Sequence, residues 1–217
     1  MGHRKKDFLV IGLGRFGTSV ARSLVEHGQE VMGVDSDEEL VMSLSHELTK
    51  TVQADATNDD TLKALGAGNF DVAVVAIGHD VHANTMATLI LKEMGVPTVI
   101  AKASNPLHQK ILHKVGADRV VFPERDMGIR LAHNLISSNI QDFLELAPNY
   151  NIMEVKVQKD WIGKSLEEMD FRANYGINVV AIMNGEKMNP APRAEDRIKA
   201  GDILIVIGHR DDLERIE

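Results

Sequence analysis

Short apolar segments alternate with helical patterns along the first part of the chain, and this alternation most constrains the possible fold. Six segments predict buried strands, and a stretch at helical spacing follows each of the first five. The expected strands are residues 8–11, 30–35, 51–54, 71–77, 98–103 and 119–122, and the expected helices are residues 17–26, 38–47, 59–65, 83–94 and 106–115. Strict alternation with short connections predicts the α/β class: a Rossmann-like doubly wound parallel sheet with helices on both faces.

A glycine-rich loop joins the first expected strand to the first expected helix. The segment VIGLGRFG, residues 10–17, places glycines at positions 12, 14 and 17. In this setting Gly12 permits a tight turn, Gly14 lets the backbone approach phosphate oxygens, and Gly17 lets helix and strand pack closely. The N-terminus of the helix then faces the anion with its partial positive charge. The alternative is that these glycines only form a turn.

Polar residues and a glycine follow the next strands, at the edge where such a sheet binds its ligand. Asp35 ends the second strand, where its carboxylate can accept hydrogen bonds from two ribose hydroxyls and would repel a 2′-phosphate, which disfavours NADP. Asp55, Ala56 and Thr57 follow the third strand, where Asp55 can accept from an adenine amino group, cap the next helix, or do both. Gly78 follows the fourth strand, at the switch of strand order where ligand crevices form.

Arg15 bears on which nucleotide the loop holds. A dinucleotide carries about two negative charges on its pyrophosphate and ATP carries about four, so a guanidinium beside the phosphates favours the more highly charged ligand. This reasoning favours ATP or ADP and leaves NAD open. The alternative is an exposed arginine on the first turn of the helix.

Composition and charge argue against several classes of protein. The formal net charge of −8 disfavours nucleic acid as a partner, because duplex-binding proteins present a basic face. The absence of cysteine excludes disulfides and thiolate metal sites and fits a reducing compartment. The longest apolar run, residues 72–77, is too short to span a bilayer, so we expect a cytoplasmic protein. The sequence contains no H-E-x-x-H, G-x-S-x-G or Walker motif, and we therefore expect no enzyme.

The pattern changes after residue 125. Residues 126–146 carry an apolar stripe at helical spacing and predict one long helix that connects two lobes. A break follows at residues 148–151, then strands are expected at 152–157, 178–183 and 203–207, and short helices at 165–172 and 210–216. Asn184 and Gly185 predict a hairpin turn with positive φ at both positions. The tail is therefore expected to be a small α+β lobe.

Seven segments together resemble the RCK family, which combines a TrkA-N and a TrkA-C domain. The segments are VIGLGRFG, VDSDEE, ADAT, VVAIG, GADRVVFPERDMG, FRANYGINVVAI and AGDILIVIG. They cover nearly the whole chain in order. More narrowly, the chain resembles the cytosolic regulatory subunits of Ktr potassium uptake systems, of the KtrA and KtrC type. The resemblance implies an N-lobe that binds ATP or ADP, and dimers that assemble into an octameric ring on a membrane potassium-translocating subunit.

The resemblance extends to single residues of the first lobe. The residues that match the family's nucleotide site are Gly12, Gly14, Arg15, Phe16, Gly17, Asp35, Asp55, Ala56, Thr57, Gly78 and Glu124. The match implies that Arg15 is directed at the terminal phosphate of ATP. Glu124, directly after Pro123, matches a glutamate near the nucleotide in the dimer interface that is linked to a divalent or monovalent cation. From the residues alone, Glu124 would pass as a neighbour of a helix N-cap, favoured by the helix dipole.

In the second lobe the resemblance implies a site for cyclic di-AMP as an effector. Arg172, Ala173, Asn178 and Pro192 fall where the family places contacts with this ligand. The loop MNPAPRAED can differ in length from the family's, so Pro190 is the alternative to Pro192. From the residues alone, Arg172 and Asn178 would be structural. The expected domains are a nucleotide-binding N-lobe with its crossover helix, residues 1–138, and a C-lobe for dimerisation and cyclic di-AMP binding, residues 139–217.

These expectations describe a nucleotide-sensing subunit that gates a membrane potassium channel or transporter and is inhibited by cyclic di-AMP. We expect it to lie at the inner face of the membrane through its partner. The alternative is an NAD(H)-dependent oxidoreductase or an NAD-sensing Rossmann protein. Against the oxidoreductase, no second domain is large enough to bind a substrate, and no acid–base pair is visible.

Overall fold

The computed structural model describes residues 5–136, 140–147 and 149–216. Contacts divide the chain into two compact units, the first ending at Pro123 and the second beginning at Glu124. The domain boundary expected between residues 138 and 139 involves residues outside the described ranges. Each unit has its own hydrophobic core and is considered by itself.

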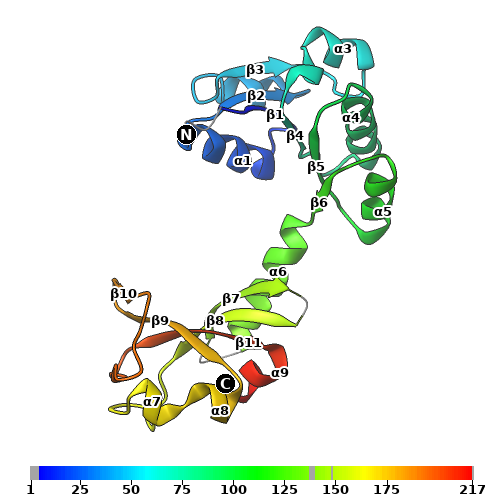
Figure 1. Ribbon diagram of the computed structural model, residues 1–217. Helices are drawn as coiled ribbons and strands as arrows, with labels where there is room; N and C mark the ends of the chain where they lie inside the picture. The colour runs from blue at the N-terminus through cyan, green and yellow to red at the C-terminus, as the bar shows by residue number, and fades with distance from the viewer. Residues whose placement is uncertain (1–4, 137–139, 148, 217) are drawn as a thin grey trace. The chain divides into compact units, whose positions relative to one another are not determined.

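The first unit is built on a six-stranded sheet with the order β3-β2-β1-β4-β5-β6. All its strand pairs are parallel. The strands are β1 (Asp7–Ile11), β2 (Glu30–Asp35), β3 (Lys50–Gln53), β4 (Val72–Val75), β5 (Thr98–Lys102) and β6 (Arg119–Val121). This order, with parallel strands throughout, confirms the predicted Rossmann-like sheet (Figure 1).

Helices cover both faces of this sheet, because successive strand residues point to opposite sides. The helices are α1 (Arg15–Glu26), α2 (Glu38–Ser43), α3 (Asp59–Ala64), α4 (Val81–Glu93) and α5 (Pro106–Lys114), with a 3₁₀ turn at Ala67–Asn69. On one face Val10 belongs to the core that α1 and α2 cover. On the other face Leu9 and Ile11 belong to the core that α3, α4 and α5 cover.

The second unit holds a five-stranded antiparallel sheet with the order β10-β9-β11-β8-β7. The strands are β7 (Ile140–Ala147), β8 (Tyr150–Lys156), β9 (Asn178–Asn184), β10 (Lys187–Asn189) and β11 (Ile203–His209). The helices are α6 (Pro123–Ile136), α7 (Leu166–Met169), α8 (Phe171–Tyr175) and α9 (Arg210–Leu213), followed by a 3₁₀ turn at Glu214–Ile216. The buried Trp161 packs edge-on against Phe171 in the core of this unit. The predicted α+β lobe is confirmed.

Three of the four sheet edges are short strands that begin with a basic residue. In the first sheet these edges are β3, which begins at Lys50, and β6, which begins at Arg119. In the second sheet the short edge is β10, which begins at Lys187 and is exposed along its length. These strands contain 4, 3 and 3 residues, respectively.

The prediction of one helix over residues 126–146 is wrong. The helix α6 ends at Ile136, and the residues from Ile140 to Ala147 form β7, which pairs with β8. Asn149, with φ 66°, provides the left-handed position of the turn between these strands, and Pro148 in the expected break lies outside the described residues. The apolar residues of this stretch fit helical spacing, but residues 140–147 form a strand because their backbone pairs with β8.

Two further local predictions differ from the structure: one expected helix is divided in two, and one hairpin turn is shifted by a residue. The helix expected over 165–172 is divided by Asp170, whose φ of 36° ends α7 and whose side chain caps α8. In the hairpin, Asn184 pairs with Lys187, so the two-residue turn is Gly185 and Glu186. Gly185 has the positive φ that the turn requires, and Asn184 remains in the strand.

Candidate functional site

The loop between β1 and α1 needs glycine at two positions for steric reasons. Gly12 has φ 92°, and a Cβ there would lie 2.9 Å from the backbone nitrogen of Ile77. A Cβ on Gly17 would lie 1.8 Å from the carbonyl oxygen of Gly12, so helix and loop touch directly. Both glycines therefore have the packing roles that the motif predicts.

Gly14 differs, because a Cβ there would meet nothing within 4 Å. Open space therefore lies over the loop at this position. Gly14 is also the N-cap of α1 and makes no side-chain capping hydrogen bond, so the cap residue leaves the N–H groups of the first turn open. A helix N-terminus with an open approach can bind an anion.

Asp35 lies beside this loop at the end of β2. One carboxylate oxygen accepts from the backbone N–H of Leu13 at 2.6 Å, and the other accepts from the N–H of Asp37 at 2.9 Å. A carboxylate has about four acceptor positions, so each oxygen retains capacity for a ribose hydroxyl. The hydrogen bond to Leu13 fixes the acid against the glycine loop.

Asp55 stabilises the turn that follows β3. Its Oδ1 accepts from the backbone N–H and the hydroxyl of Thr57, at 2.8 and 2.7 Å, and these hydrogen bonds lower the pKa of the Asp55 carboxyl. The next helix is capped by Asn58, whose side chain accepts from Thr61, so the interpretation of Asp55 as the helix cap is wrong. Ala56, between them, is buried.

Lys102 is a basic residue beside the glycine loop that the sequence analysis did not single out. Its Nζ lies 5.8 Å from the centre of the Phe16 ring and 3.2 Å from where a Cβ of Gly78 would be. It ends β5, so it lies at the same carboxyl edge of the sheet as Gly78. A basic residue ending the strand after the switch point was the signal that could have identified it.

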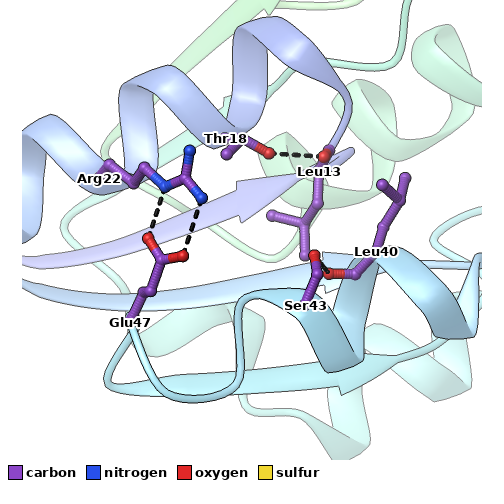
Figure 2. Close-up of polar contacts among 6 residues, drawn as sticks. All are labelled: Leu13, Thr18, Arg22, Leu40, Ser43 and Glu47. Carbon is purple, nitrogen blue, oxygen red and sulfur yellow. Dashed lines mark hydrogen bonds and ion pairs between the residues drawn. The ribbon is translucent and has the colours of Figure 1, made fainter.

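Arg15 lines a pocket of about 620 Å³ between α1 and α2. Leu13, Thr18 and Arg22 lie on the α1 side of this pocket, and Leu40 and Ser43 belong to α2 (Figure 2). Glu47 holds Arg22 in a bidentate pair, with N–O distances of 2.5 and 2.8 Å. Within the described part of the chain, Arg15 itself has neither a hydrogen bond nor an ion pair, so its exposed guanidinium is available to a ligand.

Glu124 occupies the first turn of α6. Over the residues that the structure describes, no group of three or more His, Cys, Asp or Glu side chains is arranged to hold a metal ion. A cation at Glu124 would therefore need ligands from elsewhere, such as phosphate oxygens. In the same described residues, no helix is both long and apolar enough to cross a membrane.

The C-lobe candidates form two separate groups within one chain. Arg172 and Ala173 lie in α8 and Asn178 begins β9. Pro190 and Pro192 follow β10, which pairs with the far end of β9. The loop of the prolines is held in place, because the carboxylate of Asp196 accepts from the Asn189 side chain at 3.0 Å and from the Arg193 N–H at 2.9 Å. The same loop returns to α7, because the N–H of Leu166 donates to the carbonyl of Asp196 at 3.1 Å.

Comparison with known proteins defines the class. Residues 8–123 match the TrkA-N domain and residues 152–217 match the TrkA-C domain. The GsuK channel bound to NAD shares the fold, with a TM-score of 0.69 at 17% identity, over 100% of this chain and 40% of that chain. This chain thus spans less than half the length of that channel.

Two relatives narrow the class. The chain is 46% identical to Ktr system potassium uptake protein C of Bacillus subtilis, over 98% of this chain and 96% of that protein. It is 39% identical to Ktr system potassium uptake protein A of the same organism, over 99% of this chain and 96% of that protein. The chain belongs to the family of Ktr potassium uptake regulatory subunits.

Proposed function

We propose that this chain is a nucleotide-sensing regulatory subunit that binds ATP or ADP at the glycine loop and gates a membrane potassium channel or transporter. The observation that supports the proposal is the hydrogen bond from Leu13 to Asp35, because it holds a carboxylate that can accept from a ribose beside a glycine loop that can bind phosphate. The role is regulatory and not catalytic. The chain lies on the cytoplasmic side of the membrane, held there by its partner.

ATP and ADP regulate the assembly through differential affinity. A ligand shifts an equilibrium between two states only by as much as its affinity for the two states differs. The terminal phosphate is the chemical difference between these nucleotides. Arg15 recognises that phosphate, and Glu124 binds an accompanying cation. Family membership and the exposed, unpaired guanidinium of Arg15 support this assignment.

Self-association provides the second part of the proposal. Met127, Leu131 and Leu135 recur at intervals of four along α6 and are 60%, 55% and 77% exposed. Such an apolar stripe favours a covered surface. We infer that dimers form through this helix and assemble into an octameric ring on the membrane subunit.

The C-lobe binds cyclic di-AMP, and binding reduces potassium uptake. The ligand is two-fold symmetric, so a symmetric dimer can bring Arg172, Ala173 and Asn178 of one chain and Pro192 or Pro190 of either chain around it. The two-fold symmetry of the ligand supports a site that two chains share.

The site is tested by calorimetry with ATP, ADP and NADH on the wild type and on Asp35→Asn. ATP and ADP should compete for one site, and Asp35→Asn should weaken both by about tenfold, because they share the ribose. Asp60→Asn, on the exposed first turn of α3, removes the same charge and should leave both affinities unchanged. If the affinity for NADH is far higher than the affinities for ATP and ADP, and hydride transfer to a substrate is observed, the NAD-dependent alternative holds instead.

A further inference from the structure

Lys102 reaches the glycine loop from a distant strand. In the sheet, β4 lies between β1 and β5, and Lys102 is the last residue of β5. Its Nζ is nevertheless 5.8 Å from the centre of the Phe16 ring, in the first turn of α1. The side chain therefore crosses the carboxyl end of β4, at the switch in strand order.

Gly78 leaves room for this crossing. A Cβ on Gly78 would lie 3.2 Å from Nζ and 3.9 Å from Cε of Lys102, and among the described residues other than its chain neighbours no further atom lies within 4 Å of that point. Gly78 is not among the glycines with positive φ. Glycine at position 78 therefore provides space for the Lys102 side chain, whereas the backbone conformation there would also accept alanine.

The backbone beneath Lys102 is held firmly. Asn84 of α4 is fully buried, and its Nδ2 donates to the carbonyl of Ile77 at 2.7 Å and to that of Lys102 at 3.1 Å. These hydrogen bonds join the ends of β4 and β5. The next residue, Ala103, donates to Val121 of β6 at 2.9 Å. A cation carried on a fixed backbone loses less conformational freedom when it binds a ligand.

We propose that Lys102 binds the inner phosphates of the nucleotide, those that ADP and ATP share. This inference rests on the proposed function, because it requires a nucleotide at the glycine loop. The ammonium of Lys102 reaches toward the N-terminus of α1 from the end of β5, and the glycine loop precedes that same helix. An ammonium is a compact charge that pairs well with phosphate oxygens.

The experiment compares ADP, ATP and adenosine on Lys102→Met, which removes the charge and keeps an apolar side chain. Affinity for ADP and for ATP should each fall by about tenfold, because both lose the same charge-assisted contact. Affinity for adenosine, which has no phosphate, should not change. Lys110→Met, at an exposed position of α5, is the matched control and should bind all three like the wild type.

A second variant tests the geometry without removing the charge. Gly78→Ala should displace the ammonium and weaken ADP by less than Lys102→Met does. In the double variant, Gly78→Ala should add no further loss, because its effect acts through Lys102. Additive losses would contradict that mechanism.

The outcomes separate this inference from the function on which it rests. If the wild type binds ADP and a folded Lys102→Met binds it equally well, the assignment of Lys102 is wrong and the nucleotide site stands. An equal loss for adenosine would also overturn the assignment, since it would point to a structural role. If the wild type binds none of the three ligands, both proposals fail.

Discussion

At the scale of single residues, Arg15 and Lys102 should divide the recognition of phosphate between them. Arg15→Ala should weaken ATP more than ADP and reduce the discrimination between them by about tenfold, because the guanidinium contacts only the terminal phosphate. Calorimetry with both nucleotides measures this ratio. Arg119→Ala, at the exposed amino end of β6, removes the same charge away from the glycine loop and is the control. Equal losses for ATP and ADP in Arg15→Ala would place Arg15 away from the terminal phosphate.

His108 gives the first lobe a pH dependence. It is 2% exposed, and burial lowers the pKa of its imidazole below the ordinary value of about 6.5. The N–H of Ser104 donates to Nδ1, so the proton is on Nε2, which faces the hydroxyl of Thr85. The unfolded chain therefore binds a proton more tightly than the folded lobe does.

The contribution of His108 to stability is therefore fully present above about pH 6.5 and is lost as the pH falls below it. The melting temperature of the wild type should drop between pH 7.5 and 5.5 by more than that of His108→Gln. The exposed His113, on the same helix, provides the control variant His113→Gln, which should keep the wild-type pH dependence. A wild-type drop that survives in His108→Gln would assign the effect to another group.

Single residues also show where sequence reasoning succeeds and fails at the site. Gly12, Gly17 and Asp35 could be predicted, because their roles depend on the local geometry of one loop and the end of one strand. The basic residue at the end of β5 is visible in the sequence, but its approach to the loop was not predictable, because the side chain of Lys102 crosses β4 toward Phe16, 86 positions earlier in the sequence. This crossing depends on the order of the strands and on the space above Gly78, and no local sequence motif predicts either of them.

At the scale of elements, the boundary between α6 and β7 shows the limit of periodicity. Ile140, Phe143 and Leu144 are spaced as a helix would have them, yet they lie in a strand. That strand pairs irregularly with β8, with shifts of register on both sides of its centre. These shifts interrupt the alternation of apolar and polar residues that a regular strand shows, so the sequence pattern alone could not distinguish a strand from a helix.

The exposed stripe of α6 predicts association. Light scattering at micromolar concentration with ATP present should give a homo-oligomer. Leu131→Glu should shift the population toward smaller species, since it places a charge in an apolar contact. Ala132→Glu adds the same charge one position further along the helix, off the stripe, and should have a smaller effect. A monomeric wild type would contradict the proposed assembly.

At the scale of the whole molecule, the two lobes were predictable to different degrees. The parallel, doubly wound sheet of the first lobe follows from strict alternation and right-handed crossovers, so its class of topology could be predicted. The second lobe is antiparallel, and its order β10-β9-β11-β8-β7 joins strands far apart in the sequence, such as β8 and β11. No rule of handedness fixes such an order, which is why only its α+β class could be predicted.

The cyclic di-AMP site is a prediction about two chains together. Calorimetry should give one ligand per dimer, and Arg172→Ala should weaken binding by about tenfold while light scattering shows the dimer intact. Arg210→Ala, at an exposed position on α9, should bind normally. One ligand per chain, or no binding, would leave the C-lobe as a dimerisation unit alone.

The short edge strands have a consequence for the proposed assembly of several copies. An open edge offers unpaired N–H and C=O groups to any neighbouring sheet, and strand addition of that kind leads to fibres. In β3, β6 and β10 the edge that could pair with another strand is only three or four residues long and begins with a lysine or arginine. If several copies assemble around a common axis, the positive charges on these strands would repel one another whenever two such edges approach. At these three edges, reversible contact through helices and side chains is favoured over strand addition.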